Sequence, residues 1–232
     1  MADVTLTYKG STIAEMSNTG TKTLKTSGKY CEGDIGVSYV KSSSGGSGFW
    51  DESTVKSIIE RSSILNLTLP SDLTKIGNYA FAGCNKLRLS SLPNSITEIG
   101  RYAFYNCFYT NLTSLPTSLT KIYPSAFEGC TRLNITSIPN GVTSIGERAF
   151  YDCESIKTIE IPTSVYSVGS EAFRNCLNLT KVKFKDILDT VGTNAFAYCP
   201  KLTNIYVPWA EGAVAGAPWG ATNATIHYNT TT

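Results

Sequence analysis

The sequence predicts an α/β solenoid, a chain wound into six stacked turns of 23 residues, each of which we call a coil. The first observation behind this prediction is a strict period, because apolar residues recur every 23 positions in six copies without an insertion. The second is that each copy contains a strand-like and a helix-like stretch. The stacked coils would form a parallel sheet on one side and a row of short helices on the other, after a small N-terminal β module.

The strand of each coil is predicted just before a proline that recurs with the same period. In Thr180–Phe184, polar and apolar residues alternate as they do in a strand with one buried face. Proline lacks the N–H group that a sheet requires, so it marks the end of the strand.

A short helix is predicted after the strand. From Ile76 to Phe81, apolar residues at i, i+4 and i+5 fit about one and a half helical turns. The residue before the cysteine of each coil is Gly, Asn or Asp in five coils, and these residues best tolerate the left-handed conformation that ends a helix. Tyr198 holds this position in the sixth coil and is the exception.

An aromatic column and a thiol column are predicted to form the core, because each coil has an Ala-Phe pair and, three residues later, a cysteine. The aromatic column is Phe81, Phe104, Phe127, Phe150, Phe173 and Phe196, and the thiol column is Cys84, Cys107, Cys130, Cys153, Cys176 and Cys199. Equivalent Cβ atoms on neighbouring strands lie ~4.8 Å apart, whereas a disulfide needs converging Cβ atoms ~3.8 Å apart. We therefore expect buried, reduced thiols.

The repeat unit L-P-x-x-L-x-x-I-G-x-x-A-F-x-x-C closely resembles the BspA-like, or treponemal-type, leucine-rich repeat of bacterial and phage surface proteins. The resemblance covers about residues 64–208. It implies a leucine-rich-repeat array that acts in adhesion and in protein or glycan binding. It implies no catalytic residues, since the motif consists of core positions.

Two caps are predicted at the ends of the repeats. Residues 49–63 fit an N-terminal helical cap, with acidic residues in the first turn and apolar residues on one face. Residues 209–232 depart from the repeat and fit a C-terminal cap. Trp209 and Trp219 are expected to cover the last coil rather than to bind sugar.

The N-terminal piece is predicted to be a separate small β module at residues 1–41, joined by a Ser/Gly linker at residues 42–48. Val4–Tyr8 and Ile35–Tyr39 alternate as strands do. A module of this size seldom folds alone, so we expect it to pair with copies of itself or to dock on a larger body.

Three segments of this module are similar to the leading parts of phage and prophage tail-associated proteins: Thr7–Ala14, Gly20–Thr26 and Gly28–Ile35. This second resemblance implies a homo-oligomer or docking to a virion through residues 1–41. It also implies a virion- or tail-associated protein, or one at the cell surface after lysis. The N-terminus lacks the features of a signal peptide, although a leader absent from this sequence is the alternative.

Composition argues against several classes of function. The net charge is only +2 and no Lys/Arg-rich run occurs, which argues against nucleic acid binding. No apolar stretch is long enough to insert into a membrane. The single histidine, His227, and the absence of a CxxC pair argue against a metal site, and we predict no cofactor and no enzymatic activity.

Three functions remain open at this point. The chain is a receptor-binding or adhesion component of a phage tail or similar assembly, engaging a cell-surface protein or glycan through the repeat sheet. Alternatively, it is a structural spacer of the same assembly, or a bacterial cell-surface adhesin whose leader is missing.

The candidate ligand surface follows from an irregularity between the cysteine and the proline. The fifth residue after the cysteine is apolar in the first three coils, at Leu89, Leu112 and Ile135, whereas the sixth residue is apolar in the last three. If the strand register is unbroken, these three residues form an exposed apolar stripe. The later coils then present Lys181, Lys183 and Tyr206 outward. In the alternative, the strand shifts by one residue and buries the stripe.

Overall fold

The structure is a computed structural model that describes the backbone of residues 3–8, 11–16, 22–24 and 36–40, and residues 69 and 73–230 with their side chains. The predicted linker at residues 42–48 and the predicted helical cap at residues 49–63 lie outside the described residues.

The N-terminal segment contains a four-stranded antiparallel sheet. Its strands are β1 (Asp3–Tyr8), β2 (Ser11–Met16), β3 (Lys22–Leu24) and β4 (Gly36–Val40), in the order β3-β2-β1-β4. Strand β1 contains the predicted segment Val4–Tyr8, and β4 overlaps the predicted segment Ile35–Tyr39 from Gly36 onward.

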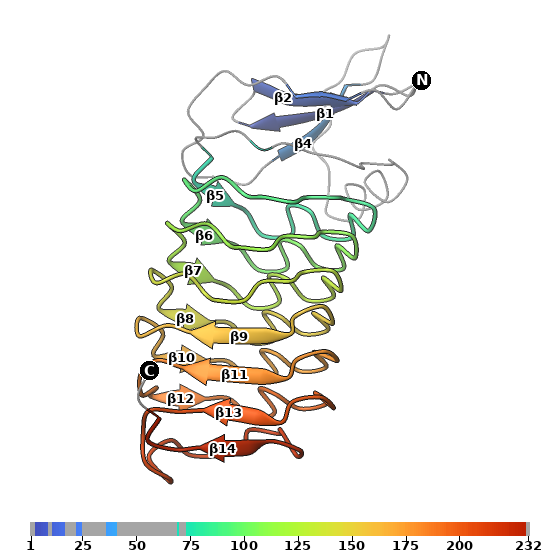
Figure 1. Cartoon of the computed structure of the whole chain (residues 1–232). Coiled ribbons are helices and arrows are strands. Elements are labelled where there is room, and N and C mark those ends of the chain that lie inside the picture. The colour runs from blue at the N-terminus through green and yellow to red at the C-terminus, as the bar shows by residue number, and fades with distance from the viewer. Residues whose placement is uncertain are drawn as a thin grey trace.

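The repeats form a β-solenoid of about seven turns with two parallel sheets (Figure 1). The first sheet comprises β5 (Lys75–Ile76), β6 (Glu98–Ile99), β7 (Lys121–Ile122), β8 (Ser144–Ile145), β10 (Ser167–Val168) and β12 (Thr190–Val191). The second comprises β9 (Thr158–Ile161), β11 (Lys181–Phe184), β13 (Asn204–Tyr206) and β14 (Thr225–His227). The sequence predicted only one sheet and placed the strands of the first sheet at the start of its helices.

An arc of tight turns takes the place of the predicted short helix, and the described residues contain no helix. In the third coil, the N–H groups of Ser125, Phe127 and Gly129 donate to carbonyls of the following coil at 2.8–2.9 Å. The alternate residues donate within their own coil, as Glu128 does to Ser125 at 3.2 Å. A helix would require all of these N–H groups within one segment. Ser125 also has a positive φ of 55°, which a right-handed helix excludes.

The phenylalanine column runs through the core as a continuous stack. Neighbouring ring centroids lie 5.1–5.6 Å apart with interplanar angles of at most 13°. All six phenylalanines and all six repeat cysteines are buried. From the second coil onward, each thiol donates to the carbonyl of the phenylalanine 26 residues earlier, at 3.0–3.4 Å. These contacts link each coil to the one before it.

The two C-terminal tryptophans cover the end of the stack. Trp209 and Trp219 are buried, and their ring centroids lie 5.4 and 6.0 Å from that of Phe184. The structure therefore agrees with a role for both rings in closing the core, and neither ring offers a free face to a ligand.

Candidate binding site

The predicted apolar stripe is not a surface. Leu89, Leu112 and Ile135 are only 2%, 0% and 0% exposed, so the hypothesis that they contact a ligand is wrong. In these coils two consecutive residues face solvent before the next buried one, as Thr113 and Ser114 do between Leu112 and Leu115. A strand alternates single residues, so this spacing breaks the strand and returns the apolar side chain to the core.

The second sheet begins where the spacing becomes regular. In β9 the burial alternates, with Ile159 and Ile161 inside and Thr158 and Glu160 outside. The following strands pair in register with β9, so equivalent residues form rows across the sheet. Two rows face solvent: Thr158, Lys181, Asn204 and Thr225 form one, and Glu160, Lys183, Tyr206 and His227 form the other.

Contacts within and between the two rows hold the side chains of this face in place. The rings of Tyr206 and His227 stack with centroids 4.5 Å apart and an interplanar angle of 12°. The Nζ atom of Lys181 lies 5.1 Å from the centroid of the Tyr206 ring, and His227 Nε2 lies 2.8 Å from Asn204 Oδ1. The structure thus brings Lys181, Lys183 and Tyr206 together on one face with Asn204, as the sequence predicted, and adds His227.

The face carries an excess of positive charge. Glu160 is the only carboxylate in the two rows, and it pairs with Lys185 at 3.3 Å. Neither Lys181 nor Lys183 has a carboxylate partner among the described residues. Unpaired ammonium groups beside stacked rings can bind an acidic group together with an apolar surface.

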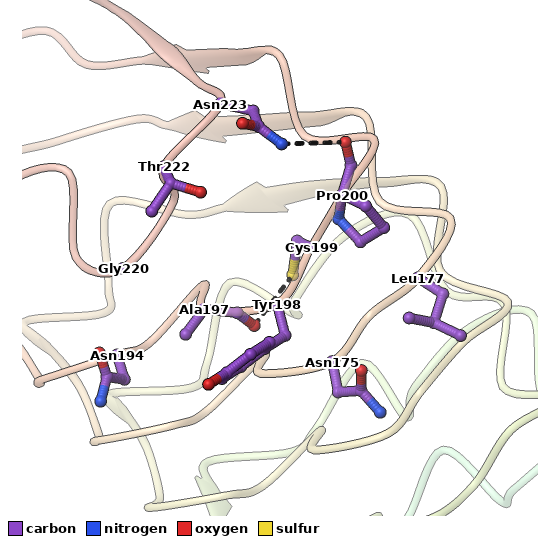
Figure 2. Close-up of a pocket in the computed structure, with 10 residues that line it drawn as sticks. All are labelled: Asn175, Leu177, Asn194, Ala197, Tyr198, Cys199, Pro200, Gly220, Thr222 and Asn223. Atoms are coloured by element: carbon purple, nitrogen blue, oxygen red, sulfur yellow. Dashed lines mark hydrogen bonds between the residues drawn. The ribbon is translucent and has the colours of Figure 1, made fainter.

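A separate pocket of about 570 Å³ lies between the sixth coil and the segment that leads into β14 (Figure 2). Three parts of the chain line it: residues 175–177, residues 194–200 and residues 220–223. Its lining includes the exposed ring of Tyr198 and the amides of Asn175, Asn194 and Asn223, and it includes no charged side chain. In the sequence, this pocket is indicated only by Tyr198, which stands where the other five coils have Gly, Asn or Asp.

The thiols of the core differ in their electrostatics. Burial raises the pKa of Cys130, Cys153 and Cys176 well above the ordinary value, because the thiolate loses its hydration. At Cys199, by contrast, a hydrogen bond with the Cys176 thiol lowers the pKa and outweighs burial. Cys199 also lines the pocket. It is therefore the thiol of the column that is best placed to react.

An ion pair between a buried acid and a half-buried arginine lies on the arc side of the solenoid. Glu128 is 7% exposed and accepts from Arg148 at 3.0 Å, but its Oε2 atom has no hydrogen-bond partner. Burial raises the pKa of Glu128 above 4.5, while a hydrogen bond from Ser125 and the charge of Arg148 lower it. Arg148 also stacks over the Tyr151 ring at 4.2 Å, so this cluster has a structural role.

The described part of the chain contains neither a metal site nor a membrane-spanning helix. No group of His, Cys, Asp and Glu side chains there could hold a metal ion. Nor do the described residues form a helix long and apolar enough to cross a membrane.

The comparison with protein families gives one match that spans most of the repeats. The profile of the family described as "BspA type Leucine rich repeat region" matches six copies within residues 55–176 and 133–211. No curated protein matches the chain.

Three solved structures are similar to this chain. A leucine-rich repeat protein from Bacteroides ovatus has 34% identity and a TM-score of 0.58, over 62% of this chain and 40% of that one. The T. pallidum leucine-rich repeat protein has 30% identity and a TM-score of 0.54, over 61% and 68% of the two chains. A leucine-rich cell surface protein from Faecalibacterium prausnitzii has 25% identity and a TM-score of 0.62, over 86% and 54%.

Proposed function

The chain belongs to the BspA-type leucine-rich repeat family, and from this premise we propose that it is a non-catalytic module that binds a cell-surface protein or glycan. The binding surface is the solvent face of the second sheet, with Lys181, Lys183 and Tyr206 at its centre. A cell surface protein from Faecalibacterium prausnitzii shares this fold, which supports a role at a surface.

The observation that carries this proposal is the arrangement of the two rows on the second sheet. Regular pairing of β9, β11, β13 and β14 holds Lys181 and Lys183, which have no carboxylate partner among the described residues, next to the stacked Tyr206–His227 pair. A flat, rigid sheet presents these groups without loss of backbone entropy on binding. Both acidic sugars and acidic protein surfaces match this chemistry.

The proposal extends to the assembly in which the module acts, namely a phage virion. The similarity of Thr7–Ala14 and the two segments that follow it to tail-associated phage proteins supports attachment to a virion through residues 1–41. The solenoid would then be the part that reaches the cell. A spacer in the same assembly and a bacterial surface adhesin are the alternatives.

Binding of the full chain to whole bacterial cells, measured by flow cytometry, tests the proposed function. The double variant Lys181→Glu/Lys183→Glu should reduce binding at least about tenfold, since it reverses the charge of the face. Lys121→Glu is the matched control, because Lys121 is an exposed lysine on β7 of the first sheet. Equal loss in both would contradict the assigned surface, and a wild-type chain that binds no cells would favour a spacer.

A further inference from the structure

The pocket beside Tyr198 contains main-chain donors that earlier coils use to hold the next coil. In five coils the residue before the cysteine donates its N–H to the following coil, as Asp152 does to Arg174 O at 3.0 Å and Asn175 to Ala197 O at 2.9 Å. The equivalent N–H of Tyr198 has no acceptor among the described residues, and neither has that of Asn194.

The C-terminal segment is offset by one residue at the same place. In the fifth coil the N–H of Phe173 donates to Ala195 O, 22 residues later, at 2.8 Å. In the sixth coil the N–H of Phe196 donates to Trp219 O, 23 residues later, at 3.0 Å. On either side of this bond, the N–H groups of Asn194 and Tyr198 reach no carbonyl of the segment. Gly220 lies close to Asn194 and Ala197 in the same place, where a Cβ atom would come within 3.0 Å of both.

The Tyr198 side chain is held where a ligand would meet it. It has a positive φ of 56°, in a column where the other five residues are Gly, Asn or Asp. A tyrosine in this conformation is strained by about 1–2 kcal/mol relative to those residues. Its side chain is nevertheless 67% exposed, and the guanidinium of Arg174 lies 4.6 Å from the ring centroid. The part of the ring that Arg174 does not cover is therefore open to a ligand in the pocket.

We propose that this pocket binds an N-acetylated hexosamine residue of a glycan. The acetamido carbonyl takes the place of the carbonyl that the following coil supplies in earlier coils, and it accepts from the N–H of Tyr198. The pyranose ring packs on the open part of the Tyr198 ring. Its hydroxyl groups bond to the amide of Asn194 and donate to the Oδ1 atoms of Asn175 and Asn223, whose Nδ2 atoms donate to Asp152 Oδ1 and Pro200 O.

The remaining lining fits the same ligand. Leu177, Ala197 and Pro200 supply apolar surface for the acetamido methyl group. The lining contains no charged side chain, and the nearby Arg174 is paired with Glu171, which favours a neutral sugar over a phosphate or a uronic acid. A volume of about 570 Å³ lies within the roughly 300–1,000 Å³ of ordinary ligand pockets.

This site shares no residue with the binding face of the second sheet, so it does not depend on the proposed function. The two sites can be tested separately in the full chain. The double variant Lys181→Glu/Lys183→Glu should leave sugar binding in the pocket unchanged.

Titration of the full chain with N-acetylglucosamine, N-acetylgalactosamine or glucose, followed by saturation-transfer NMR, tests the proposal. At least one N-acetylated sugar should bind with a Kd of about 1 mM or weaker, as is ordinary for a single small ligand. Glucose, which lacks the acetamido group, should bind at least about tenfold more weakly. If neither N-acetylated sugar binds, or if glucose binds equally well, the proposal is wrong.

Tyr198→Asn is the most informative variant, because Asn occupies this position in two other coils. It removes the ring and relieves the strained backbone, so the variant should be at least as stable as the wild type. Binding should fall at least about tenfold, since aromatic packing on the sugar is lost. Tyr166→Asn is the control, because Tyr166 is 52% exposed and does not line the pocket. Full binding by Tyr198→Asn would overturn the proposal.

Discussion

The thiol of Cys130 donates a hydrogen bond to the carbonyl oxygen of Phe104, 3.1 Å away. The two residues are 26 positions apart, which is one coil and three residues. The contact joins the thiol column to the aromatic column and couples each coil to its predecessor. The cysteines therefore act as small buried side chains with one directed polar contact, rather than as redox groups.

Thiol reactivity should follow this arrangement. In the folded protein, Cys199 should be alkylated by iodoacetamide first, because its pKa is lowered by the Cys176 thiol and it lines a pocket. Cys130, Cys153 and Cys176 should react only after denaturation, since burial raises their pKa. The seventh cysteine, Cys31, lies outside the repeats, and peptide mass spectrometry distinguishes its labelling from that of the repeat cysteines. Rapid labelling of Cys130 in the native state would contradict this order.

Leu112→Asp should lower the stability of the fold, because Leu112 is a core residue and not part of a ligand surface. A carboxylate at a site with 0% exposure loses its hydration without a partner, and the expected loss is at least about 3 kcal/mol of unfolding free energy. Thr113→Asp, at the exposed neighbouring position, should change stability by less than about 0.5 kcal/mol. Urea denaturation of both variants measures the difference. If Leu112→Asp and Thr113→Asp had similar stabilities, Leu112 would have to be a surface residue.

The aromatic stack should behave as a chain of neighbouring contacts. Phe127→Ala should lower the unfolding free energy by about 3–5 kcal/mol through the cavity that it leaves. A double-mutant cycle between Phe127 and Phe150, whose centroids lie 5.5 Å apart, should give a coupling of about 0.5–1.5 kcal/mol. The cycle between Phe81 and Phe173, which do not stack, should be additive within about 0.5 kcal/mol. Equal coupling in both cycles would exclude a role for direct contact.

The contribution of Glu128 to the free energy of unfolding should depend on pH. Its pKa in the folded protein is raised by burial, so the folded state favours the protonated acid. Its contribution is therefore fully present below the ordinary pKa of 4.5 and declines as the pH rises through the folded pKa. The unfolding free energy of the wild type minus that of Glu128→Gln should thus fall as the pH rises from the ordinary pKa of 4.5 through the raised pKa of the folded protein.

A second variant checks the sign of this effect. Ser125→Ala removes a hydrogen bond that lowers the pKa of Glu128. The decline should therefore extend to higher pH in this background, whatever constant loss of stability accompanies the substitution. A difference that rises with pH would show that the ion pair with Arg148 outweighs burial.

The sequence predicted the solenoid well because its core columns repeat without a gap. Phe127 and Cys130 occupy equivalent places in every coil, and period alone identifies such positions. The prediction of short helices was wrong, because apolar residues at i, i+4 and i+5 fit an arc of turns as well as a helix. The left-handed residues at Ser125 and its equivalents share no chemistry, so no pattern in the sequence could place them.

The candidate sites were predicted only where the strand pattern is regular. Lys181, Lys183 and Tyr206 alternate with buried residues, and the structure brings them to one face. Leu112 was placed outward because a uniform register was assumed, although the sequence also allowed a shift. The pocket depends on a single slip in hydrogen bonding at Trp219, and only the unusual residue Tyr198 signals it in advance.

The slip at Trp219 also affects how firmly the C-terminal segment is held. In the fifth coil, the N–H groups of Glu171, Phe173 and Asn175 all donate to the following coil. In the sixth coil only Phe196 donates in this way, to Trp219 O, and the N–H groups of Asn194 and Tyr198 have no acceptor among the described residues. With one such bond in place of three, this end of the arc should open locally at a lower free energy than the coils before it.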